Sequence, residues 1–222
     1  YTTSTLQQDA SHKIGMNGKR TMSLAQKLYE EGYITYHRTD SVTTSLSFQT
    51  NARSFIKKEY GDRYVPAVPR FYKTKQKLAQ EAHEAIRPTS LNNQPSTINK
   101  QLGRDYGRLY ELIWRRAVAS QMSDAIVEST TALVGATSDK RQATSGNDYL
   151  LKANGSVLVF DGFLRVNPLG LSDNRLPQFT VSEDLNLIDI LEKEHETLPP
   201  PRYNDASIIK TLEEKGIGRP ST

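Results

Sequence analysis

The sequence predicts an α+β fold: a helical part in residues 1–121, a β-rich part in residues 122–195 and the start of another helical segment in residues 196–222. Two observations support this prediction. Apolar residues recur at helical spacing through the first part, and a glycine follows two of the three runs. From about Ser123 the chain consists of short Val-, Ile- and Thr-rich runs separated by Gly, Asn and Asp, which is typical of strands.

Three segments of the first part each place apolar side chains on one face. Residues 21–31 and 44–60 are followed by Gly32 and Gly61, and glycine is a common residue just after the end of a helix. Residues 105–122 repeat the apolar spacing. We therefore expect three amphipathic helices.

The stretch between the second and third of these helices is less regular. Residues 80–87 are expected to form a short helix. Residues 89–99 are polar and are expected to form an exposed turn region. No core position is predicted in the second of these stretches.

The apolar runs of the second part are expected to be strands on either side of tight turns. These runs are residues 125–135, 149–151, 156–160 and 163–166. The turns are expected at residues 146–148 (Gly-Asn-Asp) and 153–155 (Ala-Asn-Gly).

In the third part, residues 198–201 form a stiff Pro-rich linker, and Asn204 or Asp205 can cap the helix that follows. Residues 203–216 are faintly similar to residues 1–15. Each stretch consists of a tyrosine, a polar cap, a helix and a final glycine, which is suggestive of one internal repeat.

Composition limits the possible functions. The chain has 222 residues, 36% hydrophobic and 24% charged, which is enough for one large domain or two smaller ones with an apolar core. No apolar run approaches the roughly 20 residues of a membrane span, so we expect no membrane partner. The absence of cysteine excludes disulfides, thiolate catalysis and Cys-ligated zinc within this chain.

Charge is distributed unevenly along the chain. Residues 1–121 contain 19 Lys and Arg against 10 Asp and Glu, whereas residues 122–222 contain 10 against 15. The first part is therefore the better candidate for binding a polyanion such as DNA. Solvated helix faces would also produce this excess of positive charge. The choice between these two interpretations therefore depends on the motifs.

The most informative segment is residues 32–41, Gly-Tyr-Ile-Thr-Tyr-His-Arg-Thr-Asp-Ser. A tyrosine hydroxyl can act as a nucleophile that forms a covalent intermediate, and we assign this role to Tyr36. Arg38 can hold a phosphate through its planar fork of donors. In an extended segment, Tyr36, Arg38 and Asp40 share one face, while His37 and Thr39 point to the other.

Two further blocks contain candidate DNA contacts. Residues 79–89 (AQEAHEAIRPT) contain His83, which can donate to a phosphate, and Arg87, which can either contact a phosphate or pair with Glu84. Residues 216–222 (GIGRPST) supply an arginine and two hydroxyls suited to single-stranded DNA phosphates. These candidates are Arg219, Ser221 and Thr222.

These three blocks, the last of which extends back to residue 199, resemble in this order the type IA DNA topoisomerases, the family that includes bacterial topoisomerase I. The block of residues 79–89 is most similar to the latter. The resemblance implies that Tyr36 and Arg38 are catalytic. It also implies that Arg38, Thr39, Asp40 and the candidates of the two other blocks bind DNA. Residues 1–121 would be a helix-turn-helix-related (CAP-like) domain. Residues 122–195 would be one part of a β-rich arch. Residues 196–222 would begin a returning base segment.

The resemblance also implies an activity. It is the ATP-independent relaxation of negatively supercoiled DNA through a 5′-phosphotyrosine intermediate on single-stranded DNA. The family uses Mg²⁺ held by clustered acidic residues, usually Asp-x-Asp, and this pattern is missing here. We therefore expect the metal ligands to lie outside this chain, and the chain to be inactive alone. A monomer in the bacterial cytoplasm, associated with the nucleoid, is expected.

Other interpretations stay open. Topoisomerase III and reverse gyrase share the family's motifs. A tyrosine recombinase or type IB enzyme would need a scattered Arg-His-Arg set that is not recognisable in this sequence. A non-enzymatic helix-turn-helix DNA-binding module would explain the basic helical part but not the Tyr-x-Arg-Thr-Asp motif. DNA preference separates them, because a regulator prefers a specific duplex.

Overall fold

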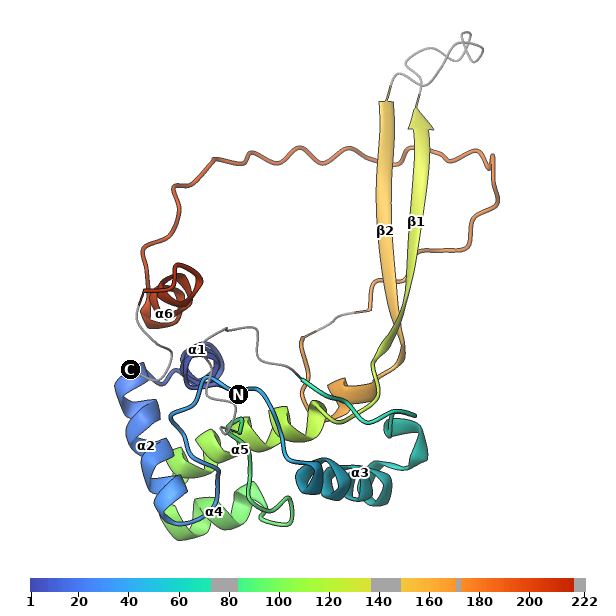
Figure 1. Ribbon diagram of the computed structural model, residues 1–222. Coiled ribbons are helices and arrows are strands. Elements are labelled where there is room, and N and C mark those ends of the chain that lie inside the picture. Colours follow the sequence, from blue (N-terminus) through green and yellow to red (C-terminus); the bar gives the residue numbers. More distant parts are fainter. Residues whose placement is uncertain (73–83, 137–148, 171–172, 218–222) are drawn as a thin grey trace. The chain divides into compact units, whose positions relative to one another are not determined.

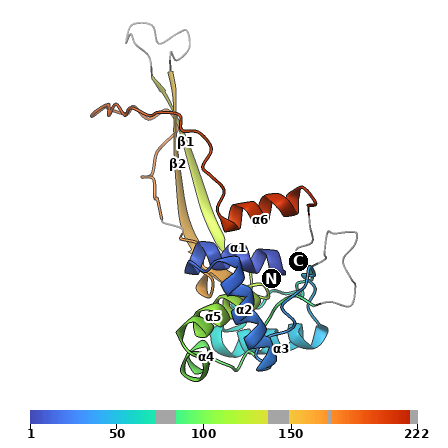
Figure 2. The same cartoon turned by 90° about the vertical axis from the view of Figure 1, so that its left-hand side faces the viewer.

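The computed structural model describes residues 1–72, 84–136, 149–170 and 173–217. Within these ranges six α-helices and one two-stranded antiparallel sheet form an α+β fold, as predicted (Figures 1 and 2). The chain divides into two compact units. Unit 1 comprises residues 1–124, 162–168 and 201–222, and unit 2 comprises residues 125–161 and 169–200. The functional division at residues 121 and 195 stays a prediction.

Unit 1 is built around one central helix, α5, against which α1, α2 and α4 pack (Figure 1). A sixth helix, α6, lies beside α1 in both views (Figure 2). The elements of this unit are α1 (Thr3–Ile14), α2 (Gly18–Glu30), α3 (Leu46–Tyr60), η1 (Asp62–Tyr64), α4 (Pro95–Leu102), α5 (Arg104–Ala119), η2 (Gly162–Arg165) and α6 (Asp205–Glu214).

The core of unit 1 is formed by apolar side chains that recur at helical spacing on α5. Leu109, Ile113 and Val118 are completely buried. They belong to one cluster with side chains from α1, α2, α3 and α4 and from the segment before α3. These side chains are Leu6, Leu28, Ile34, Ile56 and Ile98. This burial on α5 confirms the amphipathic pattern predicted for residues 105–122.

The ends predicted at residues 31 and 60 lie within one residue of the ends of α2 and α3, whereas α2 begins three residues before the predicted start. Asn17 and Ser45 cap α2 and α3 by accepting hydrogen bonds from backbone N–H groups three residues later. Asn204 caps α6 in a reciprocal capping box with Ser207, and Gly216 follows with φ +66°. α1 has the same arrangement, since Thr2 caps it through Thr5 and Gly15 has φ +66°.

Three local predictions were wrong. Residues 89–99 do not stay a turn region, because α4 begins at Pro95 and buries Ile98 against the core. One strongly buried side chain in a polar helix is too weak a periodic signal to detect. Residues 84–87 are not helical. Residues 163–166 form the end of η2 and the residue after it rather than a strand, and Val166 lies in the core of unit 1.

Unit 2 contains the hairpin of β1 (Ile126–Ala136) and β2 (Tyr149–Phe160). Residues 153–155 are not a turn, because they continue β2 and pair with Ala132, Thr131 and Thr130. Gly155 is required there for another reason: a Cβ would lie 2.7 Å from the carbonyl oxygen of Asn174. The turn predicted at residues 146–148 lies outside the described residues.

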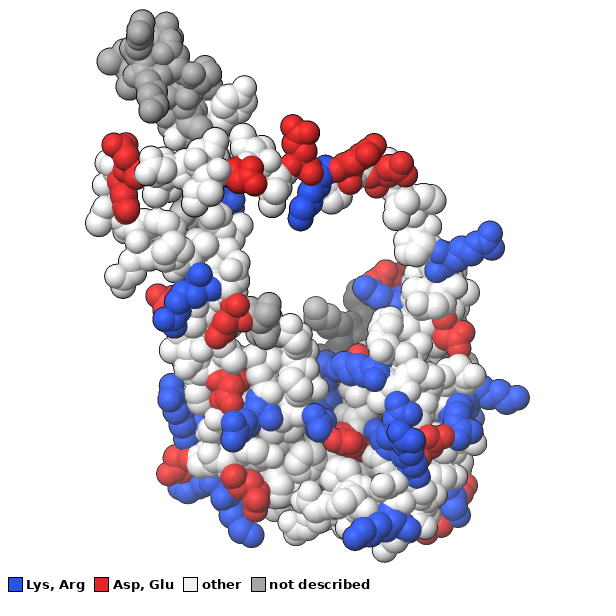
Figure 3. All heavy atoms as spheres, turned by 180° about the vertical axis from the view of Figure 1, so that it is seen from behind, with Lys and Arg blue, Asp and Glu red and all other residues white. Residues whose placement is uncertain are grey.

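The rest of unit 2 contains no helix or strand between residues 175 and 200. The β-rich character predicted up to residue 195 is therefore wrong for this segment, although its exposed apolar residues have a strand-like composition. Acidic side chains gather on it, whereas Lys and Arg are spread over the helical elements (Figure 3). Within the described ranges, no helix is long and apolar enough to cross a membrane.

Candidate functional site

The side chains of residues 36–39, in the segment after α2, alternate between solvent and core. Tyr36 is 47% exposed and Arg38 is exposed, whereas His37 and Thr39 are at most 1% exposed. Asp40 is half-buried. This alternation confirms the predicted sharing of one face by Tyr36 and Arg38, which makes both groups accessible to a ligand.

The beginning of α1 fixes the buried side of this tyrosine segment (residues 32–41). The Thr3 backbone N–H donates to the Thr39 carbonyl at 2.8 Å, and the Thr3 hydroxyl donates to the His37 carbonyl at 2.9 Å. The same hydroxyl oxygen accepts from the Thr39 N–H at 2.9 Å. The Thr39 hydroxyl itself accepts from the Ser41 N–H. Thr39 therefore shapes the segment from its buried side.

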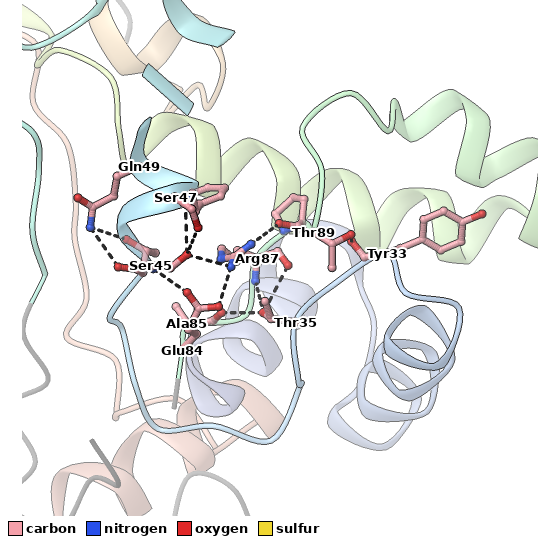
Figure 4. A network of polar contacts seen from close by, with 12 residues as sticks. Tyr33, Thr35, Ser45, Ser47, Gln49, Glu84, Ala85, Arg87 and Thr89 are labelled. Carbon is pink, nitrogen blue, oxygen red and sulfur yellow. Dashed lines mark hydrogen bonds and ion pairs between the residues drawn. The ribbon is translucent and has the colours of Figure 1, made fainter. Parts of the chain in front are cut away.

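A second segment, residues 84–89, fixes the start of the tyrosine segment (Figure 4). The Thr35 N–H donates to the Arg87 carbonyl at 2.9 Å, and the Thr89 N–H donates to the Tyr33 carbonyl at 3.0 Å. Ile34 and Pro88 form an antiparallel bridge between these bonds. Two of the three sequence blocks thus meet immediately before Tyr36.

Arg87 is partnered within the protein. Its guanidinium donates to a Glu84 carboxylate oxygen at 2.6 Å, to the Ser45 hydroxyl at 3.3 Å and to the Pro88 carbonyl at 3.0 Å (Figure 4). It also lies 4.7 Å from the centre of the Phe48 ring, and its side chain is 13% exposed. Arg87 was predicted either to contact a phosphate or to pair with Glu84. In the structure it pairs with Glu84.

The two proposed catalytic side chains are not used by the surrounding structure. Among the described residues, neither the Tyr36 hydroxyl nor the Arg38 guanidinium forms a hydrogen bond or an ion pair. The Tyr36 ring packs edge-on against the rings of Tyr29 and His37, each 5.2 Å away between centroids. The ring is thus oriented while its hydroxyl stays available.

His37 lies on the buried face, as the alternation predicted. The lack of polar partners around its ring was not predicted. It is completely buried between Tyr36 and Arg38, and both of its ring nitrogens lack a hydrogen-bond partner among the described residues. Burial lowers its pKa below 6.5, the Arg38 charge lowers it further, and Glu30 opposes the shift. Sequence gives no signal for an unpartnered imidazole at this position.

The buried His37 predicts a pH-dependent stability. Its pKa is lower in the folded state than in the unfolded one, so between the two values the unfolded chain binds more protons. Stability from this residue is complete above pH 6.5 and is lost as the pH falls through the folded pKa. As the pH falls from 6.5 through the folded pKa, the free energy of unfolding of the protein should therefore decrease relative to that of His37→Met. Urea denaturation of both proteins across this pH range measures the difference. A difference that does not change with pH would contradict this expectation.

The remaining candidates lie outside the described residues. They are His83, Arg219, Ser221 and Thr222. The helix that leads to the last three is described, however. The Ser4 hydroxyl of α1 donates to the Glu213 carboxylate of α6 at 2.6 Å, so α6 packs on the helix whose beginning holds the tyrosine segment.

A metal site does not fit the part of the chain that the structure describes. No group of three His, Asp or Glu side chains is close enough there to bind an ion. Asp40 is half-buried beside the tyrosine, but one carboxylate is not a site. No chemical step can therefore be derived through a metal from these residues.

The segment with the exposed tyrosine and arginine lies in a helical unit of a chain that belongs to the DNA topoisomerase family, whose model matches residues 1–222. Its relatives include DNA topoisomerase 1 of Rickettsia bellii (47% identical), of Xylella fastidiosa strain 9a5c (44%) and of Mycolicibacterium smegmatis (46%). These alignments cover 100% of this chain but 28%, 28% and 24% of the relatives.

A solved structure agrees with this assignment. Full-length topoisomerase I from Thermotoga maritima matches with a TM-score of 0.77 and 34% sequence identity, over 100% of this chain and 36% of that one. The sequence-based assignment to the type IA family, most similar to bacterial topoisomerase I, is confirmed. Because the chain spans under a third of these curated relatives, the activity of the whole protein is a separate question.

Proposed function

We propose that this chain carries the nucleophile of an ATP-independent type IA topoisomerase, which relaxes negatively supercoiled DNA. One observation carries the proposal: the Tyr36 hydroxyl and the Arg38 guanidinium, which have no polar partner among the described residues, share the exposed face of a segment that α1 and residues 84–89 both hold. A rigid mounting of this kind favours catalysis, because positioning supplies much of the rate enhancement.

The proposed reaction exchanges one phosphate ester for another. The Tyr36 oxygen attacks a phosphorus atom in single-stranded DNA, and the bond from phosphorus to the 3′ oxygen breaks. The proton of the phenol ends on that oxygen, so a 3′ hydroxyl is released. The 5′ phosphate stays joined to Tyr36. Reversal by the 3′ hydroxyl restores the DNA, and no ATP is required because the ester bond is conserved in the intermediate.

Arg38 holds the phosphate and stabilises negative charge that develops on its oxygens. Asp40 lies on the same side and orients this contact. Thr39 contributes from its buried side by fixing the segment, and Arg87 does so through the pair with Glu84. We assign further phosphate contacts to His83 and to the last block, Arg219, Ser221 and Thr222.

Strand passage and metal binding belong to the whole protein. In this proposal the β-rich unit is part of an arch that opens, and Mg²⁺ ligands come from parts outside this chain, which is inactive alone. The protein acts on DNA as a monomer in the cytoplasm.

The polarity of the covalent adduct tests this function. The full-length protein, supplied with magnesium, is mixed with a single-stranded oligonucleotide labelled at its 3′ end, denatured and digested. Label on the peptide that contains Tyr36 is the expected result. Label transferred only from a 5′-tagged oligonucleotide would overturn the assignment of polarity. Tight binding with neither adduct would favour a DNA-binding module instead.

A further inference from the structure

A second basic site lies in unit 1, in a groove of about 720 Å³ between α4, α5 and η2. None of its lining residues belongs to the tyrosine segment. Gly107 lies at its base, where a Cβ would be 2.7 Å from the Cβ of Asn99, so the glycine lets α4 and α5 approach closely. Its walls are polar, with Asn99 among the side chains that line it.

Positive charge dominates this groove (the α4–α5 groove). Arg104, Arg108, Arg115 and Arg165 line it, against a single acidic residue, Glu111. The first three lie along one helix at spacings of four and seven residues, so their Cα atoms span roughly 16 Å at 1.5 Å per residue. The positive charges of guanidinium groups in such a row repel one another unless anions lie along the row.

Internal pairing neutralises only part of the charge of Arg104, Arg108 and Arg115. Glu111 accepts two hydrogen bonds from Arg115, at 2.6 and 2.9 Å. Arg108 is oriented by a hydrogen bond to the Ile14 carbonyl at 3.0 Å, which carries no full charge. Arg104 is exposed, and among the described residues its side chain has no ion pair. The groove therefore has a surplus of positive charge directed at solvent.

We propose that the α4–α5 groove binds the phosphate backbone of a duplex DNA segment. Single strands are typically held by exposed aromatic rings on which bases stack. Here the groove's Trp114 is buried and donates to the Leu91 carbonyl, so its indole is committed to the core. Tyr60 also lines the groove, but its ring packs against the rings of Phe55 and Tyr64. Arginines and amides therefore supply the groove's polar contacts, and they suit the DNA backbone, which is bound independently of sequence.

The length of the arginine row agrees with this occupant. At about 3.4 Å of helix axis per phosphate on each strand, roughly 16 Å covers several successive phosphates. The inference rests on the proposed function only in taking DNA as the polyanion. It adds a site at which the protein can hold duplex DNA beside the cleaved single strand.

The test compares two double variants of the full-length protein. Arg104→Gln with Arg108→Gln removes two charges from the groove, and Lys19→Gln with Lys57→Gln removes two exposed charges from α2 and α3. Affinity for a short blunt-ended duplex is measured by fluorescence anisotropy over a range of salt concentrations. The groove variant should weaken binding and reduce the slope of log K against log salt by about 1.8, at 0.9 per lost contact. The control variant should keep the slope of the unmodified protein.

Cleavage of a labelled single strand is measured on the same proteins. Retained cleavage with a reduced duplex slope supports the groove as a separate site. Equal slopes for the groove variant, the control and the unmodified protein overturn the inference and leave the proposed function intact. Absence of cleavage in the unmodified protein overturns the proposed function, while the slopes still decide the groove. A lowered melting temperature with an unchanged slope would show that the groove packs against another part of the protein, and it also overturns the inference.

Discussion

Replacement of Tyr36 by phenylalanine is expected to lower formation of the covalent DNA adduct by about a thousandfold or more, as removal of a nucleophile does in other enzymes. The change deletes only the hydroxyl oxygen. The ring contacts with Tyr29 and His37 can stay as they are, because both are edge contacts of the ring at 5.2 Å. The free energy of unfolding should therefore change little, since that oxygen has no hydrogen-bond partner among the described residues.

Tyr33→Phe is the matched control. It makes the same chemical change three residues earlier, where the hydroxyl donates to the Gln101 side chain at 2.5 Å. This variant should lose about 1 kcal/mol of stability and keep adduct formation. Adduct yield is measured by denaturing electrophoresis of a labelled oligonucleotide, and unfolding by urea. Full adduct formation by Tyr36→Phe would exclude Tyr36 as the nucleophile.

The tyrosine segment illustrates what sequence could predict about the site. The exposure of Tyr36 and Arg38 and the burial of His37 and Thr39 agree with the alternation of side chains that the sequence analysis predicted. The contacts behind it could not be predicted, because Thr3 and residues 84–89 are distant in sequence and no pattern indicates their register. The cap of α6 at Asn204 was predicted, since capping depends on residues within one turn.

Two of the errors, at residues 89–99 and 153–155, have the same origin. α4 was missed because its helical state depends on burial of Ile98 under α5, which is a tertiary effect. The Ala-Asn-Gly sequence at residues 153–155 favours a turn locally, yet it continues β2. Its glycine is needed for close approach of Asn174. In both places a long-range contact overrides a local preference.

Arg87→Met is expected to lower the free energy of unfolding by about 2 to 3 kcal/mol, because it leaves the Glu84 carboxylate without its charged partner. The methionine keeps an unbranched apolar stem beside Phe48, so lost packing contributes little. Residues 84–89 hold the start of the tyrosine segment, so adduct formation should fall with stability. Stability is measured by urea denaturation and adduct formation on the labelled single strand.

A double-mutant cycle distinguishes this positioning role from a direct phosphate contact. Glu84→Gln removes the other charge, and the double variant should be more stable than the sum of the two single losses predicts, because no unpaired charge is left. DNA affinity should then recover with stability. If Arg87→Met instead left the free energy of unfolding unchanged and weakened single-strand binding equally with and without Glu84→Gln, Arg87 would contact phosphate directly. The geometry favours the first result, since the guanidinium already donates to Glu84, Ser45 and Pro88 and only 13% of the side chain is exposed.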